Sequence, residues 1–271
     1  MIAILKSAAA AGLALAAVAS AHAAPVAEEP PTAQEIAERA SAAAYYQGAD
    51  GKAAVSMEIE DSQGRTRRRA FTILRTDIGD EDNGEQRFYV LFSRPADVRD
   101  TAFMVWKHND RDDDRWLYLP ALDLVKRIAA SDERTSFVGS HFFYEDVSGR
   151  GPSEDEHALA ETTELYYVLD STPKDPGAVE FARYRNYIHK ETFIPVQTEY
   201  FDAAGEVYRT YRATRVETIE GKPTVVASEI ADARIGGKTT LSYTSVDYDI
   251  GLPEDIYTER YLRTPPRRHL R

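Results

Sequence analysis

Apolar and polar residues alternate along most of the chain after residue 50, and this period predicts a protein built mainly of β-strands. In the stretch 55–60, apolar side chains at the odd positions alternate with polar side chains at the even ones, as in a strand with one buried face. The turn Ser62-Gln63-Gly64 leads into a second such stretch, 67–76. Short turns follow most of the later stretches too, and short connections favour antiparallel neighbours.

Three segments have helical patterns instead. Thr32 and Glu35 form a capping box, in which each side chain can bond the backbone amide of the other, and it opens a predicted helix over residues 32–47. Residues 153–159 predict a short helix, and residues 252–262 predict a closing helix. The small side chains of the first helix would let it lie close against a sheet.

Together these elements predict an α+β fold, with one strongly curved antiparallel β-sheet of about 10–11 strands. A curved sheet of this size either closes or needs its concave face covered, and few helices are available for that. We therefore expect a half-open β-barrel with a few helices forming a lid over the concave face. Residues 32–262 would form this single domain, and residues 263–271 a basic tail.

The first residues have the pattern of an export signal. Lys6 precedes an apolar core at 7–19, and Ala21-His22-Ala23 fits a small-x-small cleavage site, so residues 1–23 are interpreted as a signal peptide. The Pro/Glu-rich stretch 24–31 would be a flexible linker. We expect the mature protein in the periplasm.

Charge and cysteine content exclude several classes of function. The chain has 33 Lys and Arg against 45 Asp and Glu, a net charge of −12, which disfavours a nucleic-acid partner because phosphate binding needs clustered cations. It has no cysteine, and this removes disulfides, thiol catalysis, thiolate metal sites and lipid attachment through an N-terminal Cys.

The central block, residues 103–150, holds both tryptophans but little catalytic chemistry. Its run Asp110–Asp114 has a D-x-D-x-D spacing, yet a calcium loop would need Gly at Arg115 and Glu at Ala121, so a solvated hairpin turn is favoured. His141 and Glu145 stand i, i+4 and could ligate a metal on a helix, but the surrounding aromatic residues favour packing. We predict no metal, no cofactor and no catalytic residue.

A basic cluster interrupts the otherwise acidic surface pattern. Its functional interpretation is docking to anionic lipid heads or to an acidic transporter surface. Its other interpretation is a solvated strand edge blunted against aggregation, and the residue pattern leaves both open. The cluster consists of Arg65, Arg67, Arg68 and Arg69.

The central block resembles the periplasmic outer membrane lipoprotein-sorting family of the LolA-like superfamily. The residues that carry the resemblance are Trp116–Leu122, Val125–Ile128, Phe137–Ser140 and Phe143–Asp146, with a similar ending at Leu252–Leu262. The resemblance covers most of the mature chain. One departure is His141, where the family pattern leads us to expect a small polar or acidic residue.

The resemblance implies a non-catalytic periplasmic carrier that binds the acyl chains of a lipoprotein or lipid in an apolar cavity. It also implies an inner-membrane RND-type exporter as partner, and we expect a monomer. Aromatic and apolar residues of the central block are the candidates for lining the cavity, although the alternation alone does not tell which sheet face is concave. These candidates are Met104, Trp106, Trp116, Tyr118, Phe137 and Phe142.

Two other functions stay open at this point. The first is a lipid-active hydrolase on the same scaffold. The chain has no G-x-S-x-G elbow, but a Ser-His-acid triad can assemble from residues that are distant in sequence. The second is an accessory or sensor subunit of a membrane transporter that carries nothing.

Overall fold

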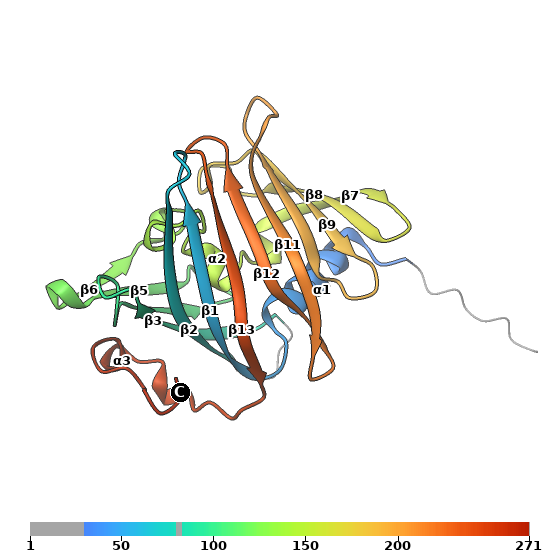
Figure 1. The fold of residues 1–271 in the computed structure, drawn as a ribbon. Coiled ribbons are helices and arrows are strands. Elements are labelled where there is room, and N and C mark those ends of the chain that lie inside the picture. The colour runs from blue at the N-terminus through green and yellow to red at the C-terminus, as the bar shows by residue number, and fades with distance from the viewer. Residues whose placement is uncertain (1–29, 80–82, 271) are drawn as a thin grey trace, which may run out of the picture. The chain divides into compact units, whose positions relative to one another are not determined.

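The computed structural model describes residues 30–79 and 83–270 (Figure 1). The predicted signal peptide and nearly all of the predicted linker lie outside these residues. Contacts divide the chain into residues 1–30 and a compact unit of residues 31–271, and every described helix and strand belongs to the second unit. None of the described helices is long and apolar enough to cross a membrane.

A single antiparallel sheet of 13 strands dominates this unit, in the order β6-β5-β4-β3-β2-β1-β13-β12-β11-β10-β9-β8-β7. The sheet does not close, because β6 and β7 are its two edges. The strands are β1 (Asp50–Glu60), β2 (Thr66–Ile78), β3 (Glu85–Arg94), β4 (Ala102–Lys107), β5 (Asp114–Leu119), β6 (Leu124–Ile128), β7 (Asp155–Thr162), β8 (Tyr166–Pro173), β9 (Arg183–His189), β10 (Pro195–Phe201), β11 (Val207–Ile219), β12 (Lys222–Asp232) and β13 (Lys238–Tyr248).

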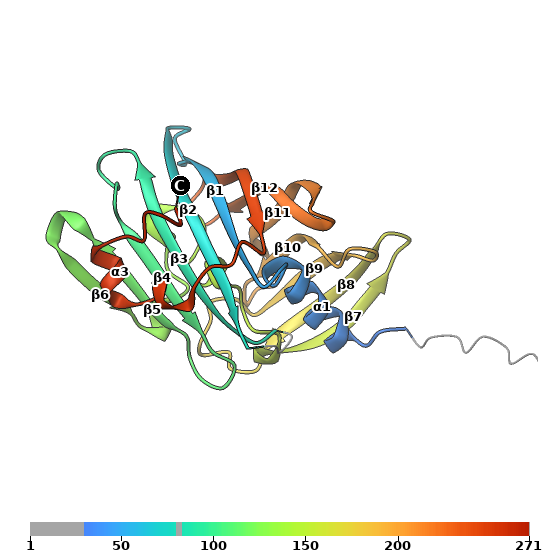
Figure 2. The ribbon, with the colours of Figure 1, turned by 90° about the horizontal axis from the view of Figure 1, so that it is seen from below.

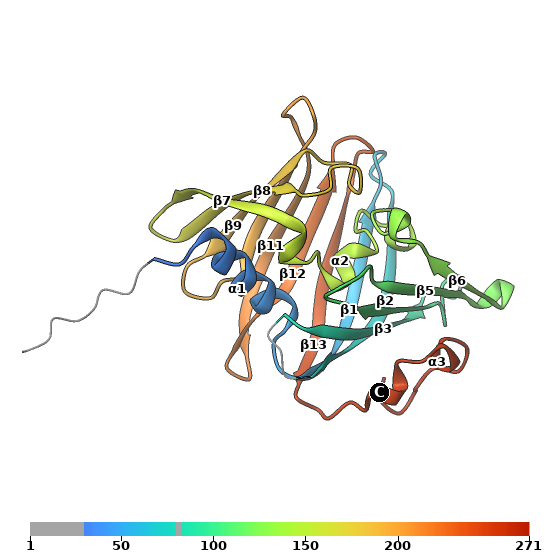
Figure 3. The ribbon, with the colours of Figure 1, turned by 180° about the vertical axis from the view of Figure 1, so that it is seen from behind.

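This strand order has a consequence for residues 129–154. They join β6 to β7, which are consecutive in the chain but lie at opposite edges of the sheet, so this crossing segment must traverse one face. Figure 3 shows α2 lying in front of the central strands. The segment forms the short helices η2 (Ala130–Asp132), η3 (Phe137–Gly139), α2 (Glu145–Ser148) and η4 (Pro152–Glu154).

Helix α1 (Ala33–Tyr45) confirms the capping box and the predicted first helix. The Thr32 hydroxyl accepts from the Glu35 amide at 3.2 Å, and the Thr32 amide donates to the Glu35 carboxylate at 2.7 Å. Ile36 and Ala40 are buried in a cluster with Leu169 of β8 and Ile188 of β9. The helix thereby lies on the same face as the crossing segment (Figure 3).

The single closing helix predicted over residues 252–262 is wrong. The segment contains η5 (Glu254–Ile256) and α3 (Glu259–Arg263), and Tyr257 between them has non-helical dihedrals (φ −94°, ψ 55°). Packing overrides the helical pattern here, because the break lets Tyr257 bury its ring and bond Thr76 through its hydroxyl at 2.8 Å. Figure 2 shows this segment running across β2–β5.

The short helix predicted at residues 153–159 is also wrong. Only η4 is helical, and residues from Asp155 onward form β7, which pairs with β8 from Asp155↔Pro173 to Thr162↔Tyr167. Long-range pairing outweighs the local helical preference of this stretch. The sheet has 13 strands rather than the predicted 10–11, and residues 155–173 supply two of them with a short turn between.

Two apolar clusters occupy opposite faces of the β2–β5 part of the sheet. The inner cluster lies beneath the crossing segment and includes Met57, Phe92 and Phe103. The outer cluster lies beneath the C-terminal segment and includes Tyr89 and Leu262. Alternation explains the division, since neighbouring residues of a strand point to opposite faces.

Candidate functional site

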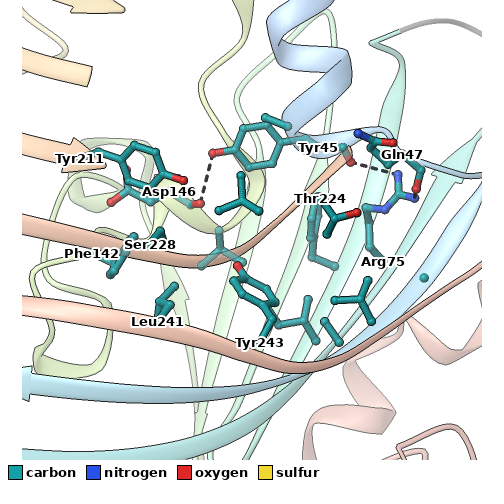
Figure 4. A pocket seen from close by; sticks show the side chains of 18 of the residues that line it. Tyr45, Gln47, Arg75, Phe142, Asp146, Tyr211, Thr224, Ser228, Leu241 and Tyr243 are labelled. Atoms are coloured by element: carbon teal, nitrogen blue, oxygen red, sulfur yellow. Dashed lines mark hydrogen bonds between the residues drawn. The ribbon is translucent and has the colours of Figure 1, made fainter. Parts of the chain in front are cut away.

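A cavity of about 300 Å³ lies between the inner face of the sheet, α1 and the crossing segment (Figure 4). Strands β1, β2, β3 and β10–β13 all contribute to its wall. In a flat sheet β3 and β10, which are six strand spacings apart, would be separated by roughly 29 Å. Side chains from both reach one cavity, so the sheet bends around it.

Most of the wall is apolar. The sheet supplies aliphatic and aromatic side chains from its central strands, and several of them also belong to the inner cluster. An apolar space of this kind favours hydrocarbon over water. The apolar sheet residues of this wall include Met57, Phe71, Ile73, Phe88, Val90, Ile230 and Leu241.

The side of the cavity opposite the sheet comes from α1 and the crossing segment. Helix α1 contributes Ala43, Ala44 and Tyr45 near its C-terminal end, and the crossing segment contributes Phe137 and Phe142. Phe137 is the centre of an aromatic group, with ring centroids 5.4 Å from Phe103 and 6.4 Å from Phe71. The small alanine side chains of the helix leave space that larger side chains at these positions would fill.

Arg75 fastens the end of α1 to the sheet at one end of the cavity. Its guanidinium donates to the carbonyl of Tyr45 at 3.0 Å and to those of Gln47 and Gly48 at 2.7 Å each. It also pairs with Asp77 at 2.6 Å. A cation on the last carbonyls of a helix is favourable because these groups carry the negative end of the helix dipole.

Asp146 marks the other labelled end of the cavity in Figure 4. Its carboxylate pairs with the fully buried Arg209 and accepts from the Phe143 amide at 2.6 Å. The Arg209 guanidinium also lies over the Phe143 ring, 3.9 Å from its centroid. Asp146 is therefore a neutralised anion that anchors the crossing segment to β11.

Tyrosine hydroxyls form the main polar feature between these ends. Burial raises the pKa of Tyr45 well above its usual range, and Asp146 and Tyr211 raise it further. Burial likewise raises the pKa of Tyr243 to about 12. These side chains are consequently neutral hydrogen-bonding groups at physiological pH.

The structure divides the six candidate residues between the two faces. Phe137 and Phe142 line the cavity. The others lie on the opposite face, in the outer cluster under the C-terminal segment, where the two tryptophan rings are 5.1 Å apart and the indole of one donates to the Tyr257 carbonyl at 2.9 Å. These four are Met104, Trp106, Trp116 and Tyr118.

Sequence reasoning missed the cavity residues of α1, β11 and β13, among them Tyr45, Tyr211 and Tyr243. Alternation groups residues by face within a strand, but the concave face is decided by the crossing segment and by the position of α1. One signal for the inner face was present. Phe137 and Phe142 lie in the segment that must traverse the sheet, so the strand face that contacts them is the inner face.

The acidic turn is exposed at residues 110–112, as predicted. Its end is not: Asp113 is half-buried, and Asp114 is buried and pairs with His108, Arg111 and Arg127. No metal-binding group of His, Cys, Asp or Glu occurs among residues 30–79 and 83–270.

His141 and Glu145 have separate partners. The His141 ring contacts the Thr239 hydroxyl at 2.8 Å, whereas Glu145 pairs with Arg134 and Arg150. Within the described part of the chain, no histidine hydrogen bond joins a serine and a carboxylate in one relay; His157 contacts Ser171 at 2.7 Å and the Pro152 carbonyl at 2.9 Å.

All four arginines of the basic cluster have partners within the molecule, and Arg65 pairs with Asp61 at 2.8 Å. Arg69 donates to the Val138 carbonyl and Arg67 to the Gly139 carbonyl, so both hold η3 of the crossing segment. Val138 has a positive φ of 48°, a conformation that a β-branched residue rarely adopts without such support. Arg68 pairs with Glu58 at the exposed surface.

Comparisons with known proteins agree with this architecture. A family model described as uncharacterized-protein-like matches residues 84–264, well over half of the chain. A DUF1329 family protein from Desulfovibrio piger is 27% identical, with a TM-score of 0.77 over 85% of this chain and 97% of its own. No curated protein matches the chain.

Two further solved structures share the fold. A domain named for outer membrane lipoprotein sorting, from Vibrio parahaemolyticus, is 24% identical, with a TM-score of 0.76 over 85% of this chain and 98% of its own. A LolA superfamily protein from Nitrosomonas europaea is 20% identical, with a TM-score of 0.65 over 86% of this chain and all of its own. The chain therefore belongs to the family that this model describes, and it shares its fold with the DUF1329, lipoprotein-sorting and LolA superfamily structures, in agreement with the resemblance of the central block.

Proposed function

We propose that this protein is a non-catalytic periplasmic carrier, which holds the acyl chains of a lipoprotein or lipid in the cavity and passes them between membrane partners. The observation that carries the proposal is the apolar cavity of about 300 Å³ between the sheet and the two segments that cover it. A water molecule occupies roughly 30 Å³ in the liquid, and a methylene group is of similar size. The cavity therefore has room for about ten methylene-sized groups.

The free energy available is sufficient for a carrier. Burying about ten methylenes at roughly 0.8 kcal/mol each gains about 8 kcal/mol before the costs of association and chain ordering are subtracted. Such an affinity would be tight enough to shield the chain in water and weak enough to release it to a partner. No acid-base chemistry is required for this role.

Carriage requires a cover that opens, and α1 with the crossing segment is the proposed lid. Both contribute residues to the cavity, and both lie on the inner face of the sheet (Figures 3 and 4). The proposed donor or acceptor is an inner-membrane RND-type exporter, and the support for that partner is the family resemblance of the central block. The predicted signal peptide supports the periplasmic location.

The experiment is native mass spectrometry of the protein purified from its own periplasm, with solvent extraction of any bound species. An acylated molecule at near-equal stoichiometry would support the carrier and identify its cargo. A matched pair of variants links the cargo to the cavity: Ala53 lines it, whereas its neighbour Ala54 is not among the lining residues. Ala53→Phe should lower lipid occupancy, and Ala54→Phe should leave it unchanged.

A protein that comes out empty, and that also fails to bind added phospholipid or acylated peptide, would contradict the carrier. The accessory-subunit function would then be the better account.

A further inference from the structure

The cavity contains a group of hydroxyls that an acyl chain alone does not need. Four different elements supply them: Tyr45 comes from α1, Tyr211 from β11, Ser228 from β12 and Tyr243 from β13. Figure 4 shows all four side chains around one cavity. Tyr200 of β10 lines the same space. We refer to these five residues as the hydroxyl cluster.

The cluster has hydrogen-bonding capacity that the described chain does not use fully. The Tyr45 hydroxyl reaches only the Asp146 carbonyl, at a long 3.4 Å. The hydroxyls of Tyr200 and Tyr243 make no hydrogen bond to any other residue among 30–79 and 83–270. Neither hydroxyl oxygen is among the fully buried, unpartnered polar atoms of these residues. Each phenol can donate one hydrogen bond and accept others, so the cluster offers both functions to a ligand.

The charges around the cavity are already neutralised. Arg75 is engaged by three carbonyls and Asp77, and Asp146 is paired with Arg209. Lys52, the other cation of the lining, pairs with Asp247 at 3.4 Å. An ionised group brought inside would lose its hydration without gaining a counterion, which is costly. An uncharged oxygen would lose only hydrogen bonds that the hydroxyls can replace.

We propose that the cavity is specific for amphiphiles whose buried part carries an uncharged oxygen group, such as a hydroxyl or an ester carbonyl, bound by the hydroxyl cluster. An ionised head group would stay outside the cavity. This inference rests on the proposed carrier function and adds the chemistry of the part that is buried. A plain hydrocarbon would enter the same space but leave the cluster without partners.

The test is displacement of the fluorescent dye N-phenyl-1-naphthylamine from the purified full-length mature protein, at a pH of about 8. The probes are dodecane, dodecan-1-ol and dodecanoate, whose length suits a cavity that holds about ten methylene-sized groups. Tyr211→Phe and Tyr243→Phe each remove one hydroxyl oxygen and keep the ring. Tyr166→Phe on β8, which is not among the lining residues, is the matched control.

We expect each cavity variant to weaken dodecan-1-ol binding about fivefold, the effect of one hydrogen bond, and to leave dodecane binding unchanged. Tyr166→Phe should change neither. Dodecanoate should bind the unmodified protein at least about tenfold more weakly than dodecan-1-ol. Ser228→Ala gives a second, smaller change that does not depend on either tyrosine variant folding well.

The outcomes separate the two proposals. If all probes displace the dye but the cavity variants affect dodecane and dodecan-1-ol equally, or affect neither, the hydroxyl cluster has no binding role while the carrier survives. Equal affinity for dodecanoate and dodecan-1-ol would overturn the exclusion of charge. If neither the dye nor any probe binds, the carrier function itself fails and the inference fails with it.

Discussion

Replacing Arg75 by methionine should detach the end of α1 from the sheet. Methionine keeps the apolar stem of the arginine but loses the guanidinium. The Tyr45 carbonyl would still accept from the Gln86 amide at 2.9 Å, whereas no other donor among residues 30–79 and 83–270 reaches the carbonyls of Gln47 and Gly48. Two half-buried carbonyls without partners and a carboxylate, Asp77, without its cation would remain.

These losses set the size of the effect. An unsatisfied buried group costs about 1–3 kcal/mol, and removing one partner of a buried ion pair costs about 3–5 kcal/mol. Because Gln86 still bonds Asp77 at 2.7 Å, we expect the free energy of unfolding of Arg75→Met to fall by about 3–5 kcal/mol rather than by the sum. Urea titration at neutral pH, with the slope unchanged, measures it.

The pH dependence gives an independent reading of the same contact. Burial raises the pKa of Asp77, while Arg75 opposes that rise. Without Arg75 the pKa of Asp77 in the folded protein would rise further, so the variant loses most stability where Asp77 is ionised. The deficit relative to the unmodified protein should therefore shrink as the pH falls.

Arg68→Met is the control, because Arg68 is exposed and pairs only with Glu58 at the surface. Its cost should stay within about 0.5 kcal/mol. A cost of less than about 1 kcal/mol for Arg75→Met, or a deficit that grows on acidification, would refute the assignment of Arg75 as the fastening of α1. Hydrogen exchange should also quicken in α1 before it does in β1.

Three further predictions concern the core, acid stability and access. Phe137→Ala should lower the free energy of unfolding in urea by about 3–5 kcal/mol, because it empties a buried site among several rings. Burial raises the pKa of Glu180, but Arg134 more than offsets this and lowers it to about 2. The ionised Glu180 carboxylate stabilises the fold fully above its ordinary pKa of 4.5, and this stabilisation is lost as the pH falls through about 2. Glu180→Gln should therefore reduce the loss of unfolding free energy with falling pH in this range. Since the chain has no cysteine, alkylation of the single thiol in Ser228→Cys reports access to the cavity. Bound lipid should slow this alkylation, and it should leave the alkylation of the exposed control Ser245→Cys unchanged.

Local signals in the sequence were sufficient for the first helix and for most strands. The capping box of Thr32 and Glu35 uses only neighbouring residues, and it forms as predicted. Alternation likewise places Met104 and Trp106 on one face of β4 and Phe103 and Val105 on the other, as the two clusters have them. These assignments depend on the period of the backbone and on little else.

The identity of the inner face depended on parts of the chain far away in sequence. The C-terminal segment covers the face of Met104 and Trp106, and nothing within β4 distinguishes that cover from a lipid cavity. Both faces of this strand are apolar, because both are covered by other segments. Tyr211 and Tyr243 were missed for the same reason, since their role follows from the bend of the sheet and the position of α1.

The order of the strands also indicates which cover of the cavity is able to move. The crossing segment is joined to the sheet at both edges and is tied in its middle by His141 to Thr239 and by Asp146 to Arg209. Helix α1 is joined to the sheet only through residues 46–49, where Gly48 has a positive φ of 71°. Swinging α1 breaks the contacts of Arg75, an apolar face and hydrogen bonds such as that from Gln86 to the Tyr45 carbonyl, whereas lifting the crossing segment would expose buried ion pairs. We therefore expect α1 to open first, so exchange in α1 that stays slower than exchange in residues 129–154 would contradict this order.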